Sequence, residues 1–257
     1  MTEKAVRILV LEHDPADPVL LLGDWLGEAG AELIICRAYA GEQIPANLDG
    51  FNALISMGGE MGARDDERAP WLPATRALLS AAVLQATPTL GICLGGQLLA
   101  AATGGAVRVG ADGPEIGAHL AAKRDAAMSD PLFADLPMTP DVLQFHYDVV
   151  STLPPGAVLL LSSTGYPNQA WRQGSAAWGL QFHVEPPPEV VREWARTDGM
   201  PITGRLGPAL DVAAETVGEV WRDFAHRFVA FARTAAGSGP GPGPGGRKLL
   251  PVVAIDE

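Results

Sequence analysis

Cysteine, positive charge and long apolar runs are all scarce in this sequence. The two cysteines among 257 residues, Cys36 and Cys93, cannot form a disulfide framework, and no CxxC or HxxxH pair indicates a metal site. The 18 basic residues are outnumbered by 30 acidic ones, which gives a net charge of −12. Because no basic surface is indicated, we expect neither nucleic acid nor an anionic membrane as a partner. The remaining candidates are a small molecule and another protein.

No segment approaches the roughly 18 consecutive apolar residues that a membrane span requires. The apolar run near the start of the chain soon meets His13 and Asp14, which is not the pattern of an export signal. We therefore expect a cytoplasmic protein, in a compartment where thiols stay reduced, that needs no metal and no cofactor. The length suits one large domain.

The sequence does contain a regular alternation of apolar strands and helices. The run from Ala5 to Leu11 is nearly all apolar, as in a strand buried on both faces. Asp17 and Pro18 are interpreted as the cap and first turn of the helix that follows. The same alternation predicts strands at 32–36, 53–57 and 89–92, and helices at 73–86 and 95–103. This order predicts an α/β fold with a doubly wound, mostly parallel sheet flanked by helices.

The second half of the chain has a different pattern. Short β-like pieces between Val107 and Gln181 are interpreted as a mixed extension of the same sheet. One helix is expected after Pro188, and a longer one at 208–234 carries an apolar stripe that faces the core. These elements define a domain at 1–236. The Gly/Pro-rich segment 237–246 is a predicted linker, and 247–257 is a predicted tail.

The segment TLGICLGGQLLA, from Thr89 to Ala100, carries the strongest chemical signal. An apolar strand runs into Gly91-x-Cys93-x-Gly95 and directly on into a helix, which is the pattern of a nucleophile elbow with cysteine as the nucleophile. Glycines suit this turn, because side chains there would collide with neighbouring strands. The helix N-terminus also favours thiolate over thiol. The alternative is a buried, inert cysteine.

A second signal, GLQFHVE, ends at Glu185. His183 and Glu185 are two apart on an extended chain and therefore project to the same side. Glu185 can accept a hydrogen bond from one imidazole nitrogen and leave the other facing the thiol. A lone histidine at a strand end is more often structural. Together the two segments predict a nucleophile, a base and a carboxylate that orients the base.

These residues resemble the class I, or triad-type, glutamine amidotransferases, whose signatures are a G-x-C-x-G elbow with a nearby glutamine and a late Q-F-H-x-E. The resemblance covers roughly residues 5–200 and is closest to stand-alone members similar to the amidotransferase domain of GMP synthase. It implies the flavodoxin-like architecture of that family. It also implies Cys93 as nucleophile, His183 as base and Glu185 as the orienting acid.

The block MGGEMGARDDERAPWL, which begins at Met57, resembles the glycine loop of the family. In the family the backbone N–H groups of this loop, here Gly58 and Gly59, join the N–H of Leu94 in an oxyanion hole. Gln97 matches the family position that contacts the substrate glutamine.

The block VLQFHYD resembles a family segment near the active site and makes His146 a candidate for lining the pocket; the alternative is a packed or surface histidine. Two residues depart from the family pattern. Glu60 stands where proline often follows the glycine pair, and Val184 stands where His-Pro-Glu is commoner. Neither departure removes a catalytic group, but Glu60 adds an acid beside the oxyanion loop.

The resemblance implies hydrolysis of the side-chain amide of L-glutamine through a cysteine thioester, with ammonia released for an acceptor. Because only a linker and a tail follow residue 236, we expect any synthase on a separate chain. The same triad would serve a γ-glutamyl hydrolase or peptidase that acts on other γ-glutamyl amides. A non-catalytic regulatory subunit is the third alternative. Its signature would be a broken triad, whereas all three members are present here.

Overall fold

The computed structural model describes residues 5–200, 202 and 206–237. Within these residues, eight strands form a central sheet in the spatial order β2-β1-β3-β4-β12-β11-β10-β7. Their bounds are β1 (Val6–Glu12), β2 (Ala31–Arg37), β3 (Ala53–Ser56), β4 (Thr89–Ile92), β7 (Ala122–Lys123), β10 (Val158–Ser162), β11 (Ala170–Gln173) and β12 (Ala177–Leu180).

The first five strands in this spatial order run parallel to one another, from β2 to β12. The last three, β11, β10 and β7, are each antiparallel to the strand before them. The chain order reverses direction next to β1, with β2 on one side and β3 on the other. The predicted doubly wound, mostly parallel sheet is therefore confirmed.

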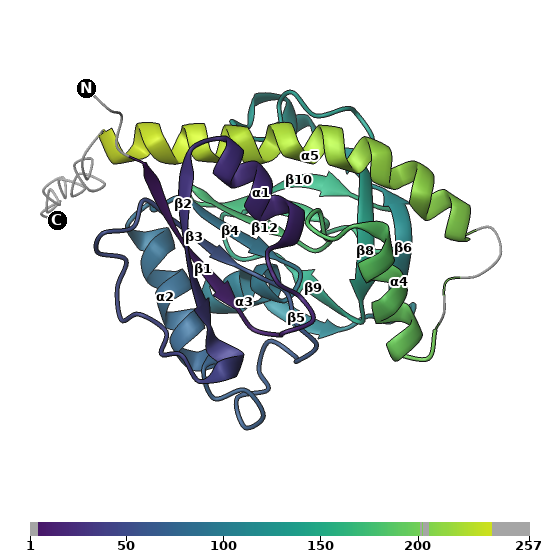
Figure 1. The fold of residues 1–257 in the computed structure, drawn as a ribbon, viewed down its shortest axis with the longest axis horizontal. Helices are drawn as coiled ribbons and strands as arrows, with labels where there is room; N and C mark the ends of the chain where they lie inside the picture. The colour runs from purple at the N-terminus through teal and green to yellow at the C-terminus, as the bar shows by residue number, and fades with distance from the viewer. Residues whose placement is uncertain (1–4, 201, 203–205, 238–257) are drawn as a thin grey trace, which may run out of the picture.

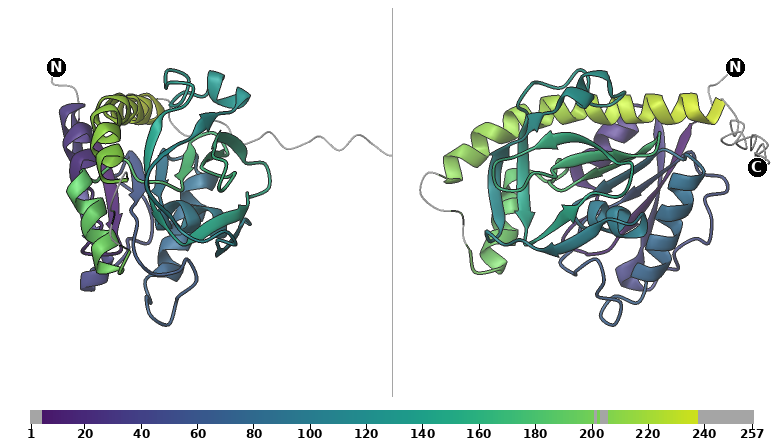
Figure 2. Two further views of the ribbon diagram at one scale, coloured as in Figure 1. Left: turned by 90° about the vertical axis from the view of Figure 1, so that its right-hand side faces the viewer. Right: turned by 180° about the vertical axis from the view of Figure 1, so that it is seen from behind.

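Helices cover both faces of this sheet (Figure 1; Figure 2). Side chains alternate along β1, so that Ile8 and Val10 join one buried cluster with α1 and α5, while Leu9 and Leu11 join a second cluster with α2 and α3. This alternation explains why the first strand is apolar on both sides. The helices are α1 (Leu20–Glu28), α2 (Leu72–Leu84), α3 (Leu94–Ala102), α4 (Pro188–Thr197) and α5 (Leu206–Gly237), with short 3-10 turns at η1 (Ala38–Ala40) and η2 (Asp125–Ser129).

Part of the predicted mixed extension lies outside the central sheet. Strand β5 (Ala106–Val109) pairs with β9 (Asp148–Thr152), and β6 (Glu115–Leu120) pairs with β8 (Asp141–His146), as two separate ribbons. The prediction was wrong for the piece VLQF, which lies in β8, because an apolar pattern indicates a strand but does not identify its hydrogen-bonding neighbour. The segments that form β10, β11 and β12 do extend the sheet.

The start of α1 also differs from the prediction. The helix begins at Leu20, Val19 is its N-cap residue, and no side chain caps it. Leu20 has a positive φ of 42°, so the chain turns sharply before the helix begins. Asp17 is therefore not the cap that its neighbour Pro18 suggests. Its carboxyl group lies instead beside His183.

The long last helix, α5, packs against β1, β6 and β8 and against α1. It ends at Gly237, which was predicted as the first linker residue. The rest of the predicted linker and the tail lie outside the described residues. In the part of the chain that the structure describes, no helix has both the length and the apolar content that a membrane crossing requires.

Candidate active site

Cys93 occupies a sharp turn between β4 and α3. Its backbone has φ 48° and ψ −107°, a region that side chains rarely occupy and that costs on the order of 1–3 kcal/mol. A Cβ added at Gly91 would lie 2.5 Å from the carbonyl oxygen of Gly95, and one added at Gly95 would lie 1.9 Å from that of Ser56. Both positions therefore require glycine, as the predicted elbow does.

The Cys93 thiol is held at the N-terminus of α3, where the helix dipole favours negative charge. The residue is 6% exposed, and its sulfur lies 3.9 Å from the carbonyl oxygen of Phe145 on β8. Cys93 is also one of the neighbours that raise the pKa of His183. The sulfur thus faces both a base and a strand from the second half of the chain.

His183 and Glu185 face each other, as their spacing predicts. The distance from His183 Nδ1 to Glu185 Oε1 is 2.5 Å, and both side chains are buried. The backbone of His183 pairs with Leu143 of β8 through two hydrogen bonds, of 2.7 and 3.2 Å. Glu185 is held in turn, since its carbonyl accepts from the Leu21 N–H and its Oε2 accepts from the Val184 N–H at 2.8 Å. The imidazole is therefore fixed from its backbone and from Nδ1.

His183 and Glu185 each shift the pKa of the other. Burial alone would lower the pKa of His183, but the charge of Glu185 and, to a smaller extent, the neighbouring Cys93 raise this pKa well above its usual value. Burial alone would raise the pKa of Glu185, but the charge and hydrogen bond of His183 and the Val184 N–H lower it. The protein interior therefore favours an imidazolium next to an ionised Glu185.

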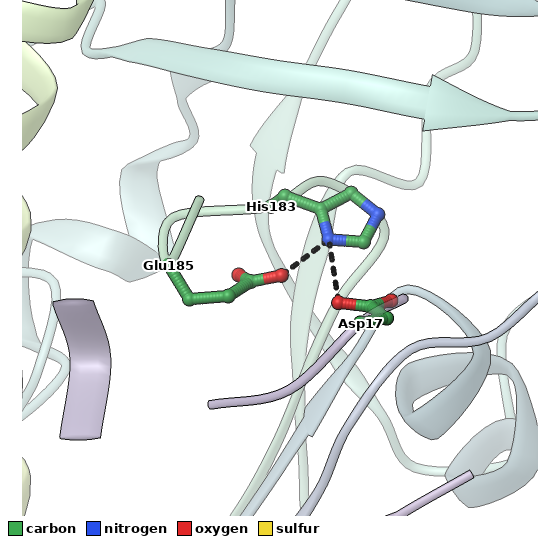
Figure 3. A group of neighbouring side chains, drawn as sticks. All are labelled: Asp17, His183 and Glu185. Atoms are coloured by element: carbon green, nitrogen blue, oxygen red, sulfur yellow. Dashed lines mark hydrogen bonds and ion pairs between the residues drawn. The ribbon is translucent and has the colours of Figure 1, made fainter. Parts of the chain in front are cut away.

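Asp17 is a third acid in the site, and our sequence analysis assigned it to a helix cap. It is 6% exposed, and its Oδ1 lies 3.9 Å from His183 Nδ1 (Figure 3). One signal could have identified it. Asp17 follows β1, and the loops at the carboxyl ends of parallel strands, where Cys93 also lies, are the usual place for a site in such a sheet.

The glycine loop lies against these residues. A Cβ added at Gly58 would be 1.9 Å from Asp17 Oδ2 and 3.1 Å from His183 Cε1. A Cβ added at Gly59 would be 3.2 Å from Leu94 Cδ2. The structure thus places Gly58 beside the imidazole and Gly59 beside the Leu94 side chain.

The two departures from the family pattern have clear surroundings. The Glu60 carboxylate is exposed and pairs with Arg68, while its backbone N–H donates to Asp14 Oδ2 at 3.1 Å. The extra acid is thereby partly neutralised outside the site. Val184 supplies an N–H to Glu185 that a proline could not supply.

Gln97 and His146 both lie near the turn between β8 and β9. Gln97 is buried and donates from Nε2 to the Asp148 carbonyl at 2.9 Å, which ties α3 to β9. The His146 ring is buried in a polar cluster, with Nε2 3.1 Å from Glu115 Oε2. Strand β8 reaches Cys93 through the carbonyl of the preceding residue, Phe145.

Trp194 on α4 covers the histidine from another side. Its ring centroid lies 4.9 Å from that of His183 and 5.7 Å from that of Phe145. The indole N–H donates to the Ala16 carbonyl at 2.9 Å. The Trp194 side chain thus connects helix α4 to His183 and to the segment after β1.

One group of side chains in the described part of the chain has a geometry that could hold a metal ion. Asp17, His183 and Glu185 offer ligand atoms that all lie within 4.8 Å of one another (Figure 3). However, His183 Nδ1 is already hydrogen-bonded to Glu185.

Comparison with known proteins agrees with this geometry. The family model for glutamine amidotransferase class-I matches residues 24–194. The glutamine amidotransferase-like protein YfeJ of Salmonella typhimurium is 31% identical over 183 residues, which cover 70% of this chain and 76% of YfeJ. A glutamine-hydrolyzing GMP synthase of Christiangramia forsetii is 34% identical over 155 residues, which cover 59% of this chain. The match spans only 28% of that longer relative.

Solved structures with the same fold include two glutamine amidotransferases. One from Thermotoga maritima superposes with a TM-score of 0.78 at 28% identity, covering 88% of this chain and 99% of that one. One from Methylobacillus flagellatus gives a TM-score of 0.77 at 28% identity, covering 90% and 96%. With its elbow cysteine, its buried His–Glu pair and these matches, the chain belongs to the class I glutamine amidotransferase family.

Proposed function

We propose that this protein hydrolyses the side-chain amide of L-glutamine to glutamate and ammonia, with Cys93 as nucleophile, His183 as base and Glu185 as the orienting acid. The observation that carries the proposal is the buried hydrogen bond between His183 and Glu185 beside a cysteine held in an elbow turn. A cysteine needs a base and an oriented imidazole for nucleophilic catalysis, and this arrangement supplies both.

In the first half of the reaction the Cys93 sulfur attacks the side-chain carbonyl carbon of glutamine. The C–N bond then breaks as His183 gives its proton to the departing nitrogen, which leaves as ammonia. In the second half, water attacks the γ-glutamyl thioester while His183 takes a proton from it. The C–S bond breaks, and glutamate and the free cysteine are regenerated.

Negative charge develops on the substrate's carbonyl oxygen in both halves of the reaction, and hydrogen-bond donors are needed to stabilise it. Leu94 is the first residue of α3, so its N–H has no partner within the helix. We assign this N–H to an oxyanion hole together with the N–H groups of Gly58 and Gly59, which the close approach of the glycine loop supports. Removal of one donor in such holes typically costs about 10²–10³-fold in rate.

Two further residues near Cys93, Gln97 and His146, are assigned roles in the site. Gln97 lies one helical turn after Cys93, and its side chain is held by the hydrogen bond to the Asp148 carbonyl. We assign Gln97 to contact with the bound glutamine. Burial and the charge of Asp65 raise the pKa of Asp148, against the opposing charge of His146. We propose that His146 contributes by holding the end of β8, whose Phe145 carbonyl faces the sulfur.

We further propose that the ammonia passes to an acceptor on a separate synthase chain. Support comes from the GMP synthases among the relatives, which are named for glutamine hydrolysis and match this chain over only 28% of their length. A cytoplasmic location fits this role, since both cysteines are free thiols and would stay reduced there.

The test is turnover of L-glutamine and of a panel of γ-glutamyl amides, with released ammonia and amine quantified separately. We expect ammonia from glutamine, and none from Cys93→Ala at equal melting temperature. Cys36→Ala removes the other thiol, which is buried in the core, and is expected to keep turnover. Turnover confined to other γ-glutamyl compounds would replace the proposal with a γ-glutamyl hydrolase, and turnover by Cys93→Ala would refute the nucleophile.

A further inference from the structure

Two carboxyl groups lie against one imidazole nitrogen. His183 Nδ1 is 2.5 Å from Glu185 Oε1 and 3.9 Å from Asp17 Oδ1 (Figure 3). Glu185 has two strong donors, the imidazole and the Val184 N–H. Asp17 Oδ1 is buried, and among the described residues it has no hydrogen-bond partner. The two acids therefore occupy very different environments within the same small space.

Two buried carboxylates whose oxygens lie within 4.8 Å of each other do not both ionise readily, so one of them keeps its proton. Glu185 is stabilised as an anion by its donors, which leaves Asp17 as the protonated acid. The charged groups that face Asp17 agree with this assignment. Burial raises the pKa of Asp17 well above its usual value, and Glu185 and Asp14 raise it further, against the opposite effect of His183.

Asp17 also touches the glycine loop. Its Oδ2 lies so close to Gly58 that a Cβ there would approach within 1.9 Å, and the same Cβ would lie 3.1 Å from the imidazole ring. The carboxyl group of Asp17 thus fills the space between the base and the loop that we assign to the oxyanion hole.

We propose that Asp17 is a positioning residue that acts as an uncharged acid. It holds the His183–Glu185 pair and the Gly58 loop in their positions relative to each other. The inference deepens the proposed function, on which the role of His183 rests. A second carboxylate at Nδ1 would stabilise the imidazolium. It would therefore hinder the transfer of a proton from the other ring nitrogen to the departing nitrogen of the substrate. A neutral carboxyl group fills the same space without that effect.

The test uses a readout that does not depend on glutamine. Cys93 is alkylated with iodoacetamide across a range of pH, and peptide mass analysis separates Cys93 from Cys36. The variants are Asp17→Asn, which mimics the protonated acid, and Asp17→Ala, which empties the space. Asp24→Asn on the exposed face of α1 is the matched control for an acid-to-amide change.

We expect Asp17→Ala to slow Cys93 alkylation at pH 7, and glutamine turnover, by about tenfold, because the space that it empties lets the His183 ring move away from its position. Asp17→Asn should rescue both, with the pH midpoint of alkylation unchanged. If Asp17 were ionised, Asp17→Asn would shift that midpoint upward by about one pH unit or more, because the imidazolium would lose a counter-charge. That shift would overturn the proposal.

Unchanged rates in Asp17→Ala would also overturn the proposal. Melting curves establish that each variant is folded, and Asp17→Ser replaces Asp17→Ala if the latter does not fold. If the wild type releases no ammonia from glutamine, the proposed function fails. The alkylation profiles still decide whether Asp17 is uncharged and whether it positions the base.

Discussion

The indole ring of Trp194 packs on the imidazole of His183, with ring centroids 4.9 Å apart and an interplanar angle of 56°. The two residues come from α4 and from the segment after β12, so this contact joins a surface helix to the base. Trp194 is anchored at its other end by the hydrogen bond to Ala16. Rotation of the imidazole away from Cys93 would require this contact to break.

Trp194→Ala should therefore lower kcat for glutamine by about tenfold, since both an aromatic contact and a hydrogen bond are lost. Trp194→Phe keeps a ring against His183 and loses only the N–H donor, so its kcat should fall by less than about threefold. Steady-state ammonia release measures both. Equal activity in the alanine variant and the wild type would show that the packing does not orient the base.

Val184→Pro tests the second donor to Glu185. Proline has no N–H, so the 2.8 Å hydrogen bond to Oε2 is lost, at a cost of about 1.5–3 kcal/mol for a charged acceptor. We expect a lower melting temperature and a smaller fraction of ionised Glu185. Val184→Ala keeps the N–H and serves as the control for the lost side chain. A proline variant no less stable than the alanine variant would contradict this role of the N–H.

The elbow should tolerate no side chain at its glycines. Gly95→Ala places a Cβ 1.9 Å from a backbone oxygen of β3, which cannot move cheaply, and we expect a loss of more than about 4 kcal/mol or no folded protein. Gly27→Ala on α1 meets nothing within 4 Å and should be neutral or stabilising by up to about 1 kcal/mol. Chemical unfolding of both variants measures the contrast, and similar stabilities would contradict the close approach at Gly95.

The pH dependence of stability should differ among the three buried groups. His183 has a raised pKa, so its contribution is full below its unfolded value and is lost as pH rises through the folded value. Glu185 has a lowered pKa, so its contribution is present above its unfolded value and is lost as pH falls through the folded value. The His183–Glu185 pair therefore stabilises the folded state most between pH 4.5 and pH 6.5, the ordinary pKa values of the two groups.

Asp17 behaves in the opposite sense to Glu185. Because its pKa is raised on folding, the folded state binds a proton, and stability falls as pH rises from 3.8 toward the folded pKa. Asp17→Asn cannot ionise, so we expect it to be more stable than the wild type at pH 7, with a gain that grows from pH 4 upward. Urea unfolding at several pH values measures this gain, and Asp24→Asn should show none. A loss of stability in Asp17→Asn at neutral pH would contradict the raised pKa.

Part of the site could be predicted from the sequence because it depends on local backbone constraints. A strand that runs directly into a helix leaves room for only a tight turn, and the glycines at 91 and 95 mark it. His183 and Glu185 face each other because residues two apart on an extended chain point to one side. Strand β4 lies at the predicted residues, since an apolar strand between turn residues is bounded by its neighbours in sequence.

The remaining parts of the site depend on how distant segments return to one sheet edge. Asp17 reads locally as a helix cap, yet its carboxyl group meets a histidine 166 positions later in the chain. Strand β8 pairs with β6 and with His183 rather than with the central sheet. The sequence by itself determined the elbow, the His–Glu pair and the alternation of strands and helices, because these follow from neighbours along the chain. Only the tertiary structure decided that Asp17, Trp194 and Phe145 surround them, because such contacts depend on loop paths and packing that no local pattern encodes.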